Sequence, residues 1–150
     1  MSDSLKSRIE AEMKASMRAK DKDRLGTIRL ILAAIKQREV DERISLDDAQ
    51  VLAVLDKMVK QRRDSIDQYR KANREDLAGV EEAELAIIQT FMPEALSEAE
   101  IDTLIDEAMS ATGAAEIKDM GKVMGYIKPK AQGRADMGAV SARIKAKLTS

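Results

Sequence analysis

The stretch that decides this fold is residues 117–136, IKDMGKVMGYIKPKAQGRAD. Three glycines, a proline and five basic residues fall within it, whereas most of the remaining chain is ordinary amphipathic sequence. Four apolar residues recur at the spacing of one helix face, Ile117, Met120, Met124 and Ile127. We expect a helix that buries this face and is weakened at its end by Pro129. Gly133 suits the C-terminal cap of that helix, and Asp136 suits the N-cap of the next one.

The glycines and bases of this stretch predict a surface that a partner approaches closely. Gly121 and Gly125 lie four residues apart, on one stripe of the expected helix. Because they have no side chains, another backbone can come near, from a packed helix or from a ligand. Five bases accompany them, Lys118, Lys122, Lys128, Lys130 and Arg134. We take these bases as a candidate anion-binding site, with Gly121, Gly125 and Gly133 allowing close approach.

Charge is distributed unevenly in the C-terminal third. Residues 94–116 carry seven acids and no base, and residues 117–150 carry eight bases and two acids. In one interpretation the two blocks neutralise each other within a small helical bundle. In the other, a basic face is directed at an anionic partner. The sequence leaves both open.

Composition excludes several classes of chemistry. The chain has no cysteine, histidine or tryptophan. Disulfides, zinc sites built on thiolate or imidazole, and enzymes with a histidine base or cysteine nucleophile are therefore excluded. No phosphate-binding loop is present, and no carboxylates converge in the pattern. We expect no catalytic residue, no metal and no cofactor, and hence no enzyme activity of the isolated chain.

Helical periodicity without period-two alternation predicts an all-α fold. Residues 45–48 begin a helix of about 25 residues, which forms a long hairpin with the helix after it. Pro93 ends the N-terminal part, and a capping box, Ser97 to Glu100, follows. We expect N-terminal helices with a long helical hairpin in residues 1–93, then a small three-helix unit in residues 94–150.

A second basic cluster, Lys60, Arg62 and Arg63, lies on the long helix. Across a hairpin these bases would pair with the acids that follow, which is the favoured interpretation, and RNA binding is the alternative. No uncharged run approaches the length of a membrane span. The first ten residues lack the apolar core of a signal peptide. We therefore expect a cytoplasmic protein that does not bind membranes.

The sequence also resembles a known family. DMGKVMG at residues 119–125 and GRAD at residues 133–136 resemble the C-terminal signature of the GatB/YqeY family. The likeness continues upstream in order, in segments that begin at Arg24, Val59, Tyr69 and Phe91. It covers nearly the whole chain and implies the same two-part helical arrangement.

The resemblance implies a role near tRNA. The family includes stand-alone proteins and the C-terminal region of the B subunit of tRNA-dependent amidotransferases, whose catalytic apparatus lies in other domains and another subunit. The region resembled here contacts tRNA, so Lys122, Lys128, Lys130 and Arg134 would be the contacts. We expect a non-catalytic tRNA-binding module, and no DNA partner. The alternative is an adaptor that docks on an amidotransferase, a synthetase or another tRNA-handling enzyme. A carbon–nitrogen ligase role would arise only within a larger complex.

Overall fold

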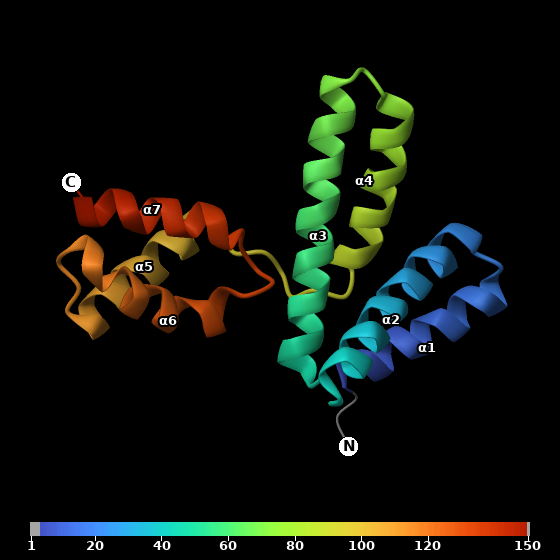
Figure 1. The fold of residues 1–150 in the computed structure, drawn as a ribbon, viewed down its shortest axis with the longest axis horizontal. Helices are drawn as coiled ribbons and strands as arrows, with labels where there is room; N and C mark the ends of the chain where they lie inside the picture. Colours follow the sequence, from blue (N-terminus) through green and yellow to red (C-terminus); the bar gives the residue numbers. More distant parts are fainter. Residues whose placement is uncertain (1–3, 150) are drawn as a thin grey trace. The chain divides into compact units, whose positions relative to one another are not determined.

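The computed structural model describes residues 4–149, and these are helical without strands (Figure 1). The all-α prediction is confirmed. The elements are α1 (Leu5–Ala19), α2 (Lys22–Glu42), α3 (Asp48–Lys71), α4 (Glu75–Gln89), α5 (Glu98–Thr112), a 3-10 turn η1 (Ile117–Asp119), α6 (Met120–Ala131) and α7 (Met137–Thr149). The chain divides into two compact units, Met1–Met92 and Pro93–Ser150. None of the helices within residues 4–149 is long and apolar enough to cross a membrane.

The N-terminal unit consists of α1 to α4. The long α3 and α4 form a hairpin, and α2 contacts both α1 and α4 (Figure 1). The backbone N–H of Leu5 donates to Asp48 Oδ1 at 2.9 Å and so ties the start of α1 to the start of α3. The side chains that are fully buried in this core are Ile9, Ile28, Ile31, Ile35, Val51, Leu55 and Ile88.

The start of α3 lies within the predicted residues 45–48. The N-cap is Asp47, whose Oδ1 accepts from the Gln50 backbone N–H at 2.9 Å. The Gln50 side chain in turn accepts from the Asp47 N–H at 3.0 Å. This reciprocal pair satisfies two backbone donors that a cap at Ser45 would leave free. The helix therefore starts three residues after Ser45.

The C-terminal unit consists of α5, η1, α6 and α7. The predicted capping box is confirmed, because the Ser97 hydroxyl accepts from the Glu100 N–H and Glu100 accepts from the Ser97 N–H, both at 3.1 Å. Helix α6 contacts both α5 and α7. The core of the unit comprises Ile105, Ala108, Val123, Ile127, Ala131, Val140, Ile144 and Leu148.

The buried face of α6 agrees with the predicted one except at Ile117, since Ile127 is buried and Met120 and Met124 pack against the core. Ile117 is 45% exposed, because residues 117–119 form the 3-10 turn η1 rather than the first turn of α6. Asp119 holds this turn, since its Oδ2 accepts from the N–H groups of Ala115 and Glu116. The buried stripe of α6 is Val123, Ile127 and Ala131, with Met120 and Met124 packed at its edge.

The end of α6 agrees with part of the prediction. Pro129 lies inside the last turn of the helix and does not end it. Gly133 adopts a positive φ of 77°, a conformation that glycine tolerates best. Asp136 caps the next helix, with its Oδ1 accepting from the Gly138 N–H at 3.0 Å. Residues 132–136 therefore form a fixed turn between α6 and α7.

Candidate nucleic-acid interface

Two glycines lie on the outward face of α6. Gly121 and Gly125 are exposed, and a Cβ added at either would meet nothing within 4 Å. Each glycine inside a helix costs about 1 kcal/mol of stability relative to alanine. No packing within the described chain requires this cost. The two glycines leave a strip of bare helix backbone that a partner can approach.

Two lysines flank this strip. The Lys122 side chain is 70% exposed, and its ammonium lies 4.0 Å from Asp119. Lys128 is exposed and forms no ion pair within residues 4–149. Lys118, at the start of η1, pairs with Glu116 at 3.1 Å, and both of those side chains are mostly exposed. Surface pairs of this kind contribute little stability, so these lysines can change partners. We call Gly121, Lys122, Gly125 and Lys128 the α6 strip.

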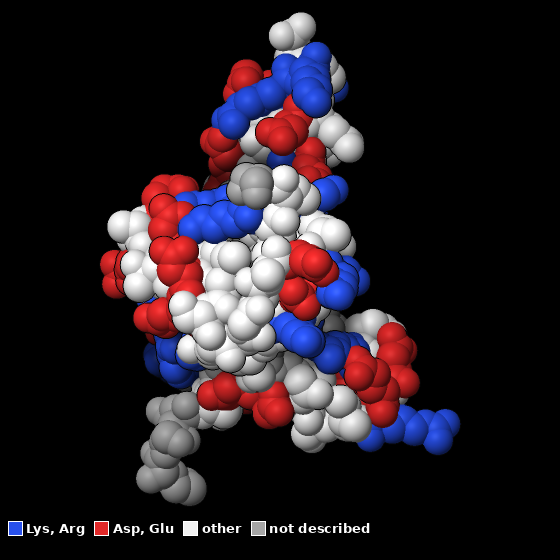
Figure 2. Space-filling model, turned by 90° about the vertical axis from the view of Figure 1, so that its left-hand side faces the viewer, with Lys and Arg blue, Asp and Glu red and all other residues white. Residues whose placement is uncertain are grey.

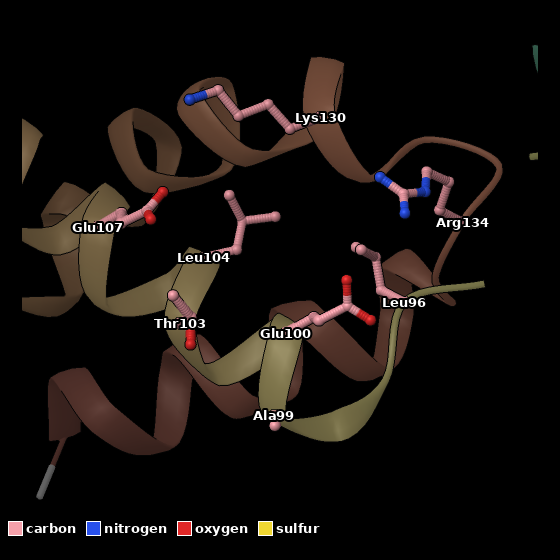
Figure 3. A pocket seen from close by; sticks show the side chains of 8 residues that line it. All are labelled: Leu96, Ala99, Glu100, Thr103, Leu104, Glu107, Lys130 and Arg134. Atoms are coloured by element: carbon pink, nitrogen blue, oxygen red, sulfur yellow. The ribbon is translucent and has the colours of Figure 1, made fainter. Parts of the chain in front are cut away.

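Lys130 and Arg134 face a different environment. They line an open groove of about 360 Å³ together with Glu100 and Glu107 of α5 (Figure 3). Lys130 Nζ lies 4.0 Å from the centre of the Tyr126 ring. Arg134 Nε donates to the backbone carbonyl of Glu94 at 2.9 Å. The two predicted contacts thus share their surroundings with carboxylates.

The carboxylates in this groove make it less suitable for phosphate. Hydrogen bonds from the Ser97 backbone and hydroxyl, with a smaller effect of Arg134, hold the pKa of Glu100 below its usual range. Glu100 is therefore ionised at neutral pH and repels an anion placed beside it. The sequence analysis missed Glu100 and Glu107 as neighbours of the bases, although their spacing of seven residues places them on one face of α5.

Two bases of α7 pair with acids of α5. Arg143 of α7 pairs with Glu98 at 2.8 Å and also with Asp102. Lys147 pairs with Asp106 at 2.8 Å. The interpretation in which the two charge blocks neutralise each other therefore holds for α5 and α7. The binding of an anionic partner stays a prediction.

Gly133 does not belong to the exposed surface. It is buried in the turn between α6 and α7, so its backbone cannot receive a partner. Its positive φ explains why glycine occupies the position. Of the three glycines predicted to allow close approach, Gly121 and Gly125 remain available.

The secondary basic cluster on α3 is only partly free. The Arg62 side chain is 15% exposed and lies 3.4 Å from Glu84 and 4.0 Å from Glu81, both on α4. Lys60 and Arg63 are exposed. On the face that Figure 2 presents, bases and acids are interspersed, including at the free end of the α3–α4 hairpin. Arg62 therefore stabilises the hairpin, as the ion-pair interpretation expects.

No metal-binding cluster is found among the described residues, where no three acidic side chains lie close enough to hold an ion.

Comparison with known proteins finds fungal relatives. The chain is 34% identical to "Altered inheritance of mitochondria protein 41, mitochondrial" of Pyrenophora tritici-repentis, over 91% of this chain and 77% of that protein. The protein of the same name from Lachancea thermotolerans is 33% identical, over 91% and 76%. The one from Vanderwaltozyma polyspora is 39% identical, but the match covers 68% of this chain and 57% of that relative.

These names overturn the prediction of a cytoplasmic location. The relatives are named as mitochondrial proteins, and this contradicts the expectation of a cytoplasmic protein. The prediction rested on the apolar pattern of the first ten residues. That pattern indicates only whether a secretory signal peptide is present, and it does not identify a compartment.

The match to a family model extends over almost the full length of the chain. The family model described as Yqey-like protein matches residues 6–148 and so spans both units. The signature recognised in the sequence, residues 119–136, lies in η1, α6 and the turn before α7. The chain therefore belongs to the YqeY-like family.

Proposed function

We propose that this chain is a non-catalytic module that binds tRNA through the α6 strip. The observation that carries the proposal is the pair of exposed helix glycines, Gly121 and Gly125, flanked by Lys122 and Lys128. The likeness to the tRNA-contacting region of amidotransferase B subunits supports tRNA as the anionic partner. The absence of histidine and cysteine from the sequence supports a binding role over chemistry.

The strip suits a sugar–phosphate backbone. Lysine ammonium groups neutralise phosphates and release counterions, which favours binding to any folded RNA. The bare helix backbone between them lets the RNA strand approach without meeting a Cβ. Recognition of this kind reads shape and phosphate positions rather than base identity. It also fits a chain with only three aromatic residues for stacking on bases.

The test is a glycine substitution that separates binding from stability. Gly125→Ala should stabilise α6 by up to about 1 kcal/mol, because alanine is the better helix former. The same methyl group should weaken tRNA affinity roughly tenfold, equivalent to about 1.4 kcal/mol, by holding the RNA strand away. Affinity is measured by filter binding or fluorescence anisotropy at low salt, and stability by thermal unfolding.

Gly79→Ala provides the matched control. Gly79 is an exposed glycine inside α4, and a Cβ there also meets nothing within 4 Å. This variant should gain similar helix stability and leave tRNA affinity unchanged. Equal affinity for Gly125→Ala and wild type would remove the strip from the interface. Failure of the wild-type protein to bind tRNA even at low salt would end the RNA proposal and leave a protein adaptor as the function to pursue.

Charge variants determine which of the bases contact phosphate. Lys122→Ala with Lys128→Ala should reduce the slope of log affinity against log salt by about two, since each phosphate contact contributes roughly 0.9. Lys130→Ala with Arg134→Ala removes the same charge from the groove that contains Glu100 and should reduce the slope less. The reverse order would place the RNA over the groove between α5 and α6.

A further inference from the structure

The groove between α5 and α6 carries charges of opposite sign on its two walls (Figure 3). Glu100 and Glu107 lie on the α5 wall, and Lys130 and Arg134 lie on the opposite wall, at the end of α6 and in the turn after it. Leu104 lies half-buried between the two glutamates along α5. Within residues 4–149, no ion pair joins one wall to the other. Charges of both signs are therefore open to a partner.

Three of these charged side chains are each held by one contact that leaves other polar atoms free. Glu100 Oε1 accepts from the backbone N–H of the capping box at 3.1 Å, and its second oxygen accepts no hydrogen bond within the described residues. Arg134 Nε donates to the Glu94 carbonyl at 2.9 Å, which leaves the terminal amino groups for a partner. Lys130 Nζ lies 4.0 Å from the centre of the Tyr126 ring. Side chains that are already ordered lose less conformational entropy when a partner binds.

The spacing of the charges on α5 fits a helix that lies along the groove. Glu100 and Glu107 are seven residues apart, and a second helix beside α5 brings residues seven apart to the same two levels, about 10.5 Å from each other. An extended strand covers about this distance in three residues, and residues three apart in a strand point to opposite faces. A single small zwitterion would meet one acid and one base and leave the other pair without a partner. The groove therefore fits a helix better than a strand or a small molecule.

We propose that the groove between α5 and α6 receives an amphipathic helix of a protein partner, with bases on the edge that faces α5 and acids on the edge that faces α6. The Leu96 N–H donates to the Arg134 carbonyl at 2.7 Å, so the start of α5 lies beside the end of α6. Arg134 and Lys130 therefore follow the groove in the same order as the two glutamates. An apolar residue between the two edges of the partner helix packs on Leu104, as in other interfaces of a helix with a groove. Nucleic acid is disfavoured, because the glutamates repel phosphates along one wall.

The experiment uses three synthetic alanine-based helices of about 15 residues, each stapled on its outward face because free helices of this length are marginal. All three have a leucine at the centre. The mixed helix carries lysines on one edge and glutamates on the other, whereas the basic helix has lysines and the acidic helix has glutamates on both edges. The full chain should bind the mixed helix roughly tenfold more tightly than the other two, because each of those places like charges against one wall. Fluorescence anisotropy at low salt measures the affinities. Equal affinity for all three helices, or no binding of the mixed helix, would overturn the proposal.

Two charge variants locate the binding in the groove. Glu107→Lys leaves one charge of each sign on the α5 wall, so the mixed and the acidic helix should bind equally well. Lys130→Glu does the same to the opposite wall, so the mixed and the basic helix should bind equally well. Lys145→Glu is the matched control, since Lys145 is exposed on α7 and does not line the groove. It should keep the tenfold preference. A preference that survives both groove variants, or that the control also removes, would overturn the proposal.

The groove shares no residue with the α6 strip, so tRNA binding and helix binding succeed or fail separately. Affinity for tRNA that depends on Lys130 more than on Lys128, without a preference among the three helices, would assign the groove to RNA and overturn the proposal.

Discussion

Helices α3 and α6 both present clusters of basic side chains, and their neighbours differ. On α3, the central base Arg62 is largely buried against Glu81 and Glu84 of α4. On α6, Lys128 has no ion pair within residues 4–149, and two exposed positions near the lysines, Gly121 and Gly125, carry no side chain. The comparison teaches that basic residues in a sequence acquire a role from what packs opposite them. A base facing a helix of acids stabilises the fold, whereas a base beside an open strip is available to a partner.

The largest expected effect separates the two regions as folding units. Ile127 is fully buried in the core of the C-terminal unit. Ile127→Ala should cost about 2–5 kcal/mol, because it removes buried methyl groups and leaves a cavity. Since the chain divides after Met92, we propose that this loss is confined to residues 93–150. Hydrogen exchange should show faster opening in α5 to α7 and unchanged protection in α3 and α4.

The matched substitution is Ile88→Ala, at a fully buried position of the N-terminal core. It should accelerate exchange in α1 to α4 and leave α5 to α7 unchanged. Loss of protection across both units from either variant would show that they unfold together, and the comparison of two independent regions would fail.

The second prediction concerns the difference between Arg62 and Lys122. Arg62→Ala should lower the free energy of unfolding by about 2 kcal/mol, because it leaves two partly buried carboxylates without their shared partner. Lys122→Ala should change stability by less than about 0.5 kcal/mol, as expected of an exposed side chain. Urea unfolding followed by circular dichroism measures both. Equal stability losses would mean that Lys122 has a structural partner too.

Local rules explain what the sequence could predict here. The capping box from Ser97 to Glu100 depends on residues three apart, and the buried stripe of α7, Val140 to Leu148, depends on helical period alone. Both are decided by neighbours in the chain. The resemblance to a known family implied the same helical arrangement and identified the signature around α6.

The sequence predicted less well where two local structures compete for the same residues, or where a side chain's neighbours come from another helix. Within the predicted helix start at residues 45–48, the choice of Asp47 as the cap depends on Gln50, which completes the reciprocal pair. Ile117 has helical spacing, but Asp119 draws its neighbours into a 3-10 turn. The carboxylates beside Lys130 and Arg134 come from α5, so only the packing of α5 against α6 reveals them.

The smallest predicted effect compares one carboxylate from each unit. Hydrogen bonds from the backbone N–H groups of Ala115 and Glu116 hold the pKa of Asp119 below its usual range. In the N-terminal unit, the Leu46 N–H, and then Lys6, lower the pKa of Glu39. A depressed pKa in the folded state means that stability is present above the unfolded pKa and is lost as pH falls through the folded one. Each carboxylate should therefore contribute to acid sensitivity from the usual carboxylate range downward, where the unfolded state binds more protons than the folded one.

Asparagine and glutamine substitutions test this contribution in each unit separately. Asp119→Asn should flatten the acid limb of stability for the C-terminal unit, because the amide cannot titrate. Glu39→Gln should do the same for the N-terminal unit. Both groups are near solvent, so the changes should be modest and should shrink as salt screens the charges. Chemical unfolding between pH 2 and 5, about the carboxylate range, with exchange rates read for each unit, gives the answer. An unchanged acid limb in both variants would mean that other carboxylates govern acid unfolding, and that η1 and the turn after α2 are held by geometry more than by charge.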